Sequence, residues 1–262
     1  MNSSIDLLLL IVAYHPKQQE IDELGQCLEQ LPEKIRYAIV ANDYKPGEPI
    51  NKLSNNALKF IRLSSNLGYG RAANLLANSF VTLPPYVAVL NTDLSWSPET
   101  FPRTLQWLFH NKEVCLAVPQ IVNQSGDIEK LCKRNPTLLA LFSRRFLPEY
   151  VKPKWLKRYD AWYCMNDHDY TSVFESSYLS GCCMIINSSI FINSGGFDER
   201  FFLYLEDADL TRRLTSFGKC VHLPYVNVTH NWGRGNHKKM WLSIINIFSA
   251  CKYFFKWGLS LW

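Results

Sequence analysis

Leu7-Leu-Leu-Leu-Ile-Val-Ala13 is an unbroken apolar run near the start of the 262-residue chain. A short run without polar alternation is typical of a strand buried on both faces, as in a parallel sheet. Pro16 follows the run, and apolar residues then recur at helical spacing from Ile21 to Leu31. Because parallel strands are joined by crossover helices, this beginning predicts a β-α-β unit.

The same alternation continues through the first 120 residues. Further strands are expected at 35–41, 60–63, 86–90 and 114–118, and further helices at 66–80 and 97–109. This order predicts a doubly wound α/β domain with a mostly parallel central sheet flanked by helices. Ligands of such sheets bind beyond the carboxyl ends of the strands. Four polar sites fall at these predicted ends: Tyr14, Asp43, the segment 66–74 and Asp93.

The region 120–176 has a less regular pattern and is basic and aromatic. Between Lys130 and Arg158, nine Lys or Arg residues accompany one acid, Glu149. Such a stretch is either a solvated loop or a contact for anionic lipid, nucleic acid or a phosphorylated substrate. Beyond it, a strand is expected at 177–187, and short β-like pieces at 220–223 and 226–229.

Three carboxylates, Glu206, Asp207 and Asp209, directly follow an aromatic run, and Arg212 and Arg213 come next at helical spacing. One interpretation is a helix N-terminus, where acids favour the helix dipole and Asp209 pairs with one of the arginines. The other is catalysis, because a carboxylate packed among apolar residues has a pKa that can be tuned to accept a proton. The position after the predicted sheet favours catalysis.

Residues 238–262 are predicted to form an amphipathic helix. At about 100° per residue, one narrow arc collects an apolar stripe: Trp241, Ile244, Phe248, Cys251, Phe255, Leu259 and Trp262. Lys252 and Lys256 lie on the other side. Such a helix either docks on the domain or lies in a membrane interface, and further aromatics outside the stripe favour a membrane or a partner.

The cysteine pattern favours a reducing cytosol. None of the eight cysteines forms a Cys-x-x-Cys pair, and the adjacent Cys182 and Cys183 lie in an apolar run, as buried free thiols would. The run 7–13 is too short for a signal peptide, and no basic residue precedes it. No stretch reaches the roughly 18 apolar residues needed to cross a bilayer.

Asn91-Thr92-Asp93 follows a predicted buried strand at the expected ligand edge. A carboxylate there can hold Mg²⁺ or Mn²⁺ against a diphosphate, because these cations prefer oxygen ligands; the alternative is a turn Asp that caps the next helix. His230 and Arg234 could add a metal ligand and a positive charge for phosphate. Gly68 and Gly70 open a helix whose N-terminus favours anions, although no Rossmann fingerprint or P-loop is present.

Taken together, several motifs give the chain a resemblance to a known family. In chain order they are Val12-Ala-Tyr-His15, Asn66-Leu-Gly-Tyr-Gly-Arg-Ala-Ala-Asn74, Leu90-Asn-Thr-Asp-Leu94, Ser180-Gly-Cys-Cys-Met184, Gly195-Gly-Phe-Asp-Glu-Arg-Phe-Phe202, Glu206-Asp-Ala-Asp-Leu-Thr-Arg212, and His230 with Tyr253-Phe-Phe-Lys-Trp-Gly258. The chain resembles the inverting family 2 glycosyltransferases of the GT-A fold, and among them the rhamnosyltransferase-like enzymes of bacterial O-antigen and capsule assembly. We therefore expect a GT-A domain over 1–237, with a nucleotide-sugar half at about 1–120 and an acceptor half at about 120–237, and a helical tail at 238–262.

The resemblance also implies residue roles. Asp207 matches the catalytic base of the family's Glu-Asp motif, and Glu206 supports it or the acceptor. Asp93 matches the metal-binding Asp of a DXD-type motif whose first acid is Asn91 here, and His230 is the other metal candidate, for Mg²⁺ or Mn²⁺. The implied donor site is Ala13, Tyr14, Asn42, Asp43, Asn66, Gly68, Arg71, Asn74, Asn91, Asp93 and Arg234, and the implied acceptor site is Gly181, Phe202 and Tyr204.

The predicted activity is inverting, metal-dependent transfer of a sugar, with L-rhamnose from dTDP-L-rhamnose as the leading donor. The expected acceptor is a saccharide on a polyprenyl diphosphate at the cytoplasmic face of the membrane, where the basic stretch and the tail would bind lipid. Another hexose or N-acetylhexosamine from a UDP- or GDP-sugar is an alternative. A catalytically degenerate nucleotide-sugar-binding protein is an alternative of a different class, favoured by Asn91. Nucleic-acid binding lacks a recognised motif, and a nucleotidyltransferase would carry a Gly-rich basic loop after the first strand.

Overall fold

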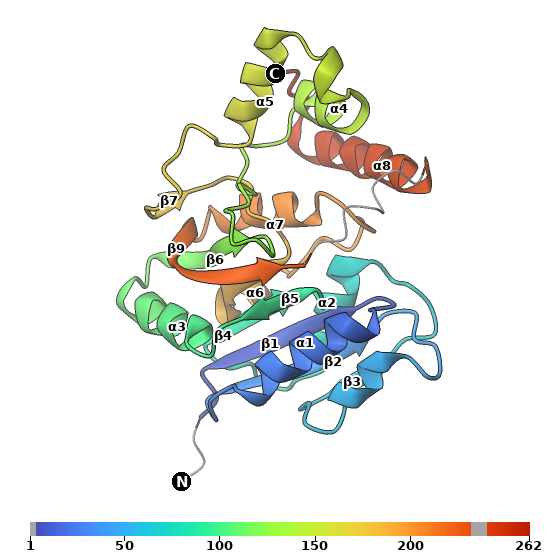
Figure 1. The fold of residues 1–262 in the computed structure, drawn as a ribbon, viewed down its shortest axis with the longest axis vertical. Coiled ribbons are helices and arrows are strands. Elements are labelled where there is room, and N and C mark those ends of the chain that lie inside the picture. Colours follow the sequence, from blue (N-terminus) through green and yellow to red (C-terminus); the bar gives the residue numbers. More distant parts are fainter. Residues whose placement is uncertain (1–3, 232–239) are drawn as a thin grey trace.

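A nine-stranded sheet forms the centre of the molecule (Figure 1). The computed structural model describes residues 4–231 and 240–262. The strands are β1 (Leu7–Ala13), β2 (Ile35–Ala41), β3 (Phe60–Arg62), β4 (Tyr86–Leu90), β5 (Leu94–Trp96), β6 (Val114–Val122), β7 (Phe174–Glu175), β8 (Cys183–Asn187) and β9 (Lys219–His230). Their order is β3-β2-β1-β4-β8-β6-β9-β5, and β7 pairs with β9.

Most strands run in one direction. β1 is parallel to β2 and β4, β2 to β3, and β6 to β9, whereas β8 is antiparallel to both β4 and β6. β5 and β7 pair antiparallel with β9. The predicted mostly parallel α/β sheet is therefore confirmed, and the carboxyl ends of β1 to β4 meet at one edge.

Helices flank the sheet (Figure 1). They are α1 (Gln18–Glu29), α2 (Tyr69–Asn78), α3 (Thr100–His110), α4 (Leu138–Phe146), α5 (Lys154–Tyr163), α6 (Ser188–Asn193), α7 (Glu206–Leu214) and α8 (Met240–Trp257), with short 3₁₀ helices at Pro49–Leu53 and Glu149–Val151. In Figure 1, α4, α5 and α8 lie together at one end of the long axis, and α1 and β3 lie toward the other end. The catalytic candidates on α7 lie between these two ends.

The N-terminal half follows the sequence pattern closely, and β1 shows why. Every residue from Leu7 to Ala13 is buried, because β2 and β4 cover both edges and helices cover the sheet. Fully burying one Leu side chain stabilises the fold by about 1.5–3 kcal/mol. The run of four leucines thus fixes β1 at the middle of the core.

The second half departs from expectation in several places. The strand expected at 177–187 begins only at Cys183, the two pieces at 220–223 and 226–229 form the single strand β9, and the three-residue β5 was not expected. Helices α4 and α5 lie in the region that was predicted to be irregular. In α4 the apolar Leu138, Phe142 and Phe146 are exposed, while Ala140 and Ser143 are buried, so the apolar period does not mark the buried face.

The C-terminal amphipathic helix is present as α8, beginning at Met240 among the described residues. It docks on the domain through Ile245, Ser249 and Tyr253, which are buried. Tyr253 joins an apolar cluster with Phe201 and other residues around α7. The predicted apolar stripe faces solvent instead, because the helix turns a different face toward the protein; Phe255, for example, is 91% exposed.

All eight cysteines are free thiols, and the predicted burial of Cys182 and Cys183 is confirmed. Among the helices within 4–231 and 240–262, none combines the length and hydropathy required to traverse a bilayer.

Candidate active site

Two adjacent carboxylates begin helix α7. Glu206 and Asp207 are its first residues, and the preceding Tyr204 and Leu205 have φ angles of 70° and 66°. Left-handed backbone is uncommon for residues with large side chains, and it persists only where the surroundings hold it. Leu205 is buried beside Tyr253 of α8 in the same apolar cluster, so packing holds the turn that presents the acids.

The Asp207 carboxylate is bound on both oxygens. The backbone N–H of Gly181 donates to Oδ2 at 2.9 Å, and the N–H of Ala208 donates to Oδ1 at 2.9 Å. The Tyr178 hydroxyl also hydrogen-bonds this carboxylate. A Cβ atom on Gly181 would lie 3.1 Å from the Asp207 Cβ, so glycine allows this close approach.

Glu206 and Asp207 differ in how strongly their surroundings favour the protonated form. Burial raises the pKa of Glu206 to about 8, and the charge of Asp207 is the second cause. Burial also raises the pKa of Asp207, but the Lys133 charge, the Gly181 and Ala208 N–H groups and the Tyr178 hydroxyl oppose that rise. Two buried carboxylates this close do not both ionise at neutral pH. The arrangement therefore favours a neutral Glu206 beside an ionised Asp207.

Lys133 is a functional candidate that sequence reasoning did not single out. Its backbone N–H donates to the Tyr178 carbonyl at 2.9 Å, and its ammonium lies 4.3 Å from the centre of the Tyr178 ring. Burial lowers the pKa of Lys133, and the Asp207 charge opposes the shift. A single Lys within a basic stretch carries no sequence signal for this position, which depends on the isolated bridge between residues 133 and 178.

The predicted basic stretch divides into internal and exposed residues. The Lys152 ammonium is 2.7 Å from Asp160 Oδ2, with 3% of its side chain exposed, and Arg134 pairs with Asp167 at 2.7 Å. These two residues serve internal contacts, as Lys133 does. The exposed remainder lies mainly on α4 and α5: Arg144, Lys154, Lys157 and Arg158.

A second polar centre forms where β5 meets the end of β9. Leu94 pairs with His230, which places the His230 Nε2 3.2 Å from the Asp93 Oδ2. The His230 Nδ1 is 3.9 Å from the Glu129 Oε2. The pairing of the short strand β5 with β9 explains why His230, which is distant in sequence, lies beside Asp93. Glu129 is a further neighbour that the sequence did not predict.

The Asp93–His230 pair suits a divalent cation. Asp93 Oδ1 is buried, and no hydrogen-bond partner for it lies within the described residues. Carboxylate oxygen and imidazole nitrogen are ligands that Mn²⁺ accepts. Within 4–231 and 240–262, however, no three His, Cys, Asp or Glu side chains gather as a metal cluster. The pair therefore fits a cation that takes its other ligands from a substrate or water.

The dipeptide Gly181-Cys182 joins the two centres. The Gly181 N–H binds Asp207, and the Cys182 carbonyl accepts the Asn91 N–H at 3.1 Å. This follows from the pairing of β8 with β4, which sets Cys183 opposite Leu90. Segments about 90 residues apart in sequence thus meet at the carboxyl ends of the parallel strands, the edge where the strand pattern predicts a ligand.

The ends of β1 and β2 supply the outer part of the predicted donor site. Ala13 is buried, whereas Tyr14 is 54% exposed. His15 has a φ of 45° and places its Nε2 3.1 Å from the Asp43 Oδ2, while its Nδ1 contacts Glu48. The hydrogen bond that the imidazole donates to the Glu48 carboxylate is the main cause that raises the His15 pKa. Tyr14 and Asp43 remain predicted donor contacts at this edge.

Asn42 has an internal role instead. Its amide nitrogen donates to Asn66 Oδ1 at 2.8 Å and to the Gly68 carbonyl at 3.3 Å, and its oxygen accepts the Leu67 N–H at 2.8 Å. Asn42 is buried, and its side chain is occupied in holding the turn before α2. The donor contacts of Asn42 and Asp43 stay predictions.

Gly68 and Asn74, at the start and in the middle of α2, lie against the segment 197–202 and do not line an open phosphate-binding loop. A Cβ on Gly68, whose φ is 87°, would lie 2.3 Å from the Phe202 carbonyl oxygen. The Asn74 amide accepts the Phe197 N–H at 2.9 Å and donates to the Phe197 carbonyl at 2.8 Å. Both groups thus approach protein backbone, and their donor contacts stay predictions.

The other predicted contacts have varied surroundings. Arg71 pairs with Glu199 at 3.3 Å with 54% of its side chain exposed. Phe202 and Tyr204 are partly exposed near α7, where they stay acceptor predictions. Arg234 lies outside the described residues.

A cavity of about 460 Å³ borders His230 on the side of α1. Glu20, Glu23 and Glu129 line it, whereas Asp207 does not. An acidic lining disfavours a diphosphate by charge repulsion. The strand edge with Tyr14, Asp43 and Asp93 stays the predicted donor site.

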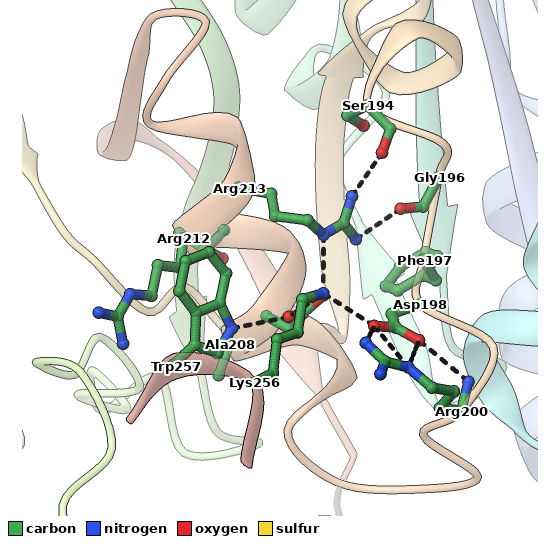
Figure 2. Close-up of polar contacts among 12 residues, drawn as sticks. Ser194, Gly196, Phe197, Asp198, Arg200, Ala208, Arg212, Arg213, Lys256 and Trp257 are labelled. Atoms are coloured by element: carbon green, nitrogen blue, oxygen red, sulfur yellow. Dashed lines mark hydrogen bonds and ion pairs between the residues drawn. The ribbon is translucent and has the colours of Figure 1, made fainter. Parts of the chain in front are cut away.

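Asp209 connects the acidic helix to α8. Its carboxylate, with no exposed surface, lies 2.8 Å from Arg213 Nε and 2.7 Å from the Lys256 ammonium, and it accepts the Trp257 indole N–H at 2.8 Å. The predicted pairing with Arg213 is confirmed. Figure 2 shows the Arg213 guanidinium donating to the carbonyls of Ser194 and Gly196. We call Asp209 with Arg213, Lys256 and Trp257 the Asp209 latch.

Comparison with known proteins decides the family. The profile of glycosyl transferase family 2 matches residues 10–191, more than half of the chain. The chain belongs to this family. The chain is 26% identical over 202 residues to the N-acetylglucosaminyl-diphospho-decaprenol L-rhamnosyltransferase of two Mycobacterium tuberculosis strains, across 73% of this chain. It spans 64% of the length of these curated relatives.

Solved structures share the fold of this chain. GalNAc-T7 with UDP, GalNAc and Mn²⁺ has a TM-score of 0.62 at 13% identity, over 88% of this chain and 45% of that one. A mannosyltransferase from Pyrobaculum calidifontis with GDP-Man and Mn²⁺ has a TM-score of 0.61 at 14% identity, over 97% and 64%. The GT-A fold that the resemblance implied is confirmed.

Proposed function

We propose that the protein transfers a sugar from a nucleoside diphosphate to a hydroxyl of a saccharide acceptor, with inversion at the anomeric carbon. The observation that supports this most is the buried Asp207 carboxylate, which the Gly181 and Ala208 N–H groups hold close to the loop that carries Asp93. The resemblance of both segments to family motifs agrees with it.

In the proposed reaction the acceptor hydroxyl attacks the anomeric carbon as the diphosphate leaves, and Asp207 takes the hydroxyl proton. The Gly181 and Ala208 N–H groups hold the Asp207 carboxylate in place, and Lys133 keeps it ionised. A single displacement inverts the anomeric centre. Asp93 and His230 would hold Mg²⁺ or Mn²⁺, which supplies positive charge near the leaving phosphate.

We propose dTDP-L-rhamnose as the donor and a polyprenyl-diphosphate-linked saccharide as the acceptor, used at the cytoplasmic membrane surface. The name of the mycobacterial relatives, which states an L-rhamnosyl group and a diphospho-decaprenol acceptor, supports this choice. A UDP- or GDP-linked hexose or N-acetylhexosamine is the alternative donor class, because solved neighbours carry UDP with GalNAc and GDP-Man.

A thermal-shift screen of nucleotide sugars, each with Mn²⁺, Mg²⁺ or EDTA, tests the donor. Binding to the folded state raises the unfolding midpoint by mass action, so the true donor should stand out in the presence of metal. Replacing Asp93 with Ala should abolish the metal-dependent part of the shift. If the donor raised the unfolding midpoint equally with EDTA and in Asp93→Ala, Asp93 would hold no metal.

The position of Lys133 predicts a change in the pH dependence of the reaction. Its charge lowers the Asp207 pKa, so Lys133→Met should raise that pKa and move the acidic limb of the pH–rate profile to higher pH. Lys133→Arg should restore the limb. A uniform loss of rate at every pH, with the limb unmoved, would mean that Lys133 only supports the fold.

Donor hydrolysis separates the enzyme from a degenerate binding protein. Slow release of free nucleoside diphosphate is expected from an enzyme, because water can replace the acceptor. A binding protein would release none, while still showing the thermal shift.

A further inference from the structure

The exposed apolar side chains are concentrated at one end of the molecule. Of the 24 large apolar side chains that are exposed in the described residues, 16 belong to 138–162 or 240–262, which are less than a fifth of the chain. These two segments contain α4, α5 and α8, which Figure 1 shows together at one end of the long axis. We call this the α4–α5–α8 surface.

Hydrogen bonds make the surface one unit. The Leu138 N–H donates to the Ser260 carbonyl at 2.9 Å, and the Leu139 N–H to the Leu261 carbonyl at 3.0 Å. The Arg145 guanidinium donates to the Ser243 hydroxyl at 2.9 Å. The carbonyl groups of the chain after α8 thus accept hydrogen bonds from the first N–H groups of α4. These bonds hold the two helices in a fixed arrangement.

The outer side of α8 carries its most exposed aromatics. Trp241, Phe248 and Phe255 are 66%, 63% and 91% exposed. The inner side is engaged by Tyr253 and by the Asp209 latch, so the helix is not free to turn its apolar stripe inward. Soluble proteins rarely keep so many large apolar side chains exposed at one end of the molecule unless they bind something there.

The charge on the surface selects the class of partner. The segments 138–162 and 240–262 contain eight Lys or Arg and two acids. Both acids contact Lys152, and five basic side chains are exposed: Arg144, Lys154, Lys157, Arg158 and Lys252. Two copies of such a surface would repel each other, whereas anionic lipid headgroups attract it. Trp and Tyr side chains are also enriched at bilayer interfaces.

We propose that the α4–α5–α8 surface docks on the interface of an anionic phospholipid bilayer, with Trp241, Phe248 and Phe255 inserted among the lipids and the exposed basic residues on the headgroups. The Ser249 hydroxyl binds the Leu203 carbonyl at 2.8 Å, just before the catalytic acids. Docking therefore brings the acceptor side of the site to the membrane, a consequence that rests on the proposed lipid-linked acceptor.

Vesicle flotation of the full chain tests the docking. Wild type should float with vesicles of phosphatidylcholine containing about 30% phosphatidylglycerol, and less with phosphatidylcholine alone. The variant Trp241→Ser/Phe248→Ser/Phe255→Ser should bind at least about 30-fold more weakly. Its matched control, Val81→Ser/Phe217→Ser/Tyr225→Ser, removes three exposed apolar side chains elsewhere and should bind like wild type.

A charge variant and two further measurements complete the test. Lys154→Glu/Lys157→Glu/Arg158→Glu should lose the preference for anionic vesicles. Unchanged unfolding midpoints and donor shifts show that each variant is folded, and they keep a failure of docking distinct from a failure of the proposed transferase. Equal flotation of the α8 variant and its control overturns the proposal. So does light scattering that shows a dimer which the α8 variant dissociates, since the surface then joins two copies.

Discussion

Replacing Asp207 with Asn is expected to lower turnover by about 10²–10⁴-fold while donor binding is retained. The substitution keeps the size of the side chain but removes the group that accepts the hydroxyl proton. Turnover is measured with the donor found in the thermal-shift screen, and donor affinity is measured in parallel. Turnover near the wild-type rate would show that another group is the base.

The matched variant Glu206→Gln should behave differently. Because the Glu206 pKa is about 8, Glu206 carries a proton at pH 7, and Gln reproduces its neutral form. We expect turnover at pH 7 to stay within about tenfold of wild type. A loss as large as that of Asp207→Asn would assign the proton transfer to Glu206, so the pair of variants decides between the two adjacent acids.

The Asp209 latch predicts the second large effect, on stability. Asp209→Asn leaves Arg213 without its buried carboxylate partner, while Lys256 keeps only its ion pair with Asp198. Removing one member of a buried ion pair costs about 3–5 kcal/mol in the free energy of unfolding. Urea unfolding measures this loss.

A solvent-exposed ion pair provides the control for Asp209→Asn. Glu113 pairs with Lys219 at 3.8 Å, and both side chains are about half exposed. Exposed pairs contribute little because solvent screens them, so Glu113→Gln should leave the unfolding curve nearly unchanged. If Asp209→Asn also left the unfolding curve nearly unchanged, the latch would not stabilise α7.

The sequence predicted the first half of the fold because its signals are local. Buried strands such as 7–13 and 35–41 are apolar runs, and the polar residues after them must lie at the sheet edge. The acids at 206, 207 and 209 were recognisable because buried carboxylates need partners. The pairing of Asp209 with one of the arginines at 212 and 213 was predictable for the same reason.

The remaining features depend on contacts between distant segments. Nothing in residues 94–96 indicates that β5 brings His230 to Asp93, and Lys133 reaches the catalytic acid only through its bridge to Tyr178. Asn42 and Asn74 look like ligand contacts in sequence, but the fold saturates their amides with backbone groups. In α8 the apolar stripe and the docked face differ, which hydrophobic periodicity alone does not reveal.

The latch also has a consequence for the order of events during synthesis. Trp257 lies 48 residues after Asp209, so a ribosome that adds about 5–20 residues per second delivers it roughly 2–10 s later. Until then the sheet and its crossover helices can form, while the Asp209 carboxylate has only its nearby partner Arg213. The contacts of Asp209 with Lys256 and Trp257 are thus among the last in the domain to form.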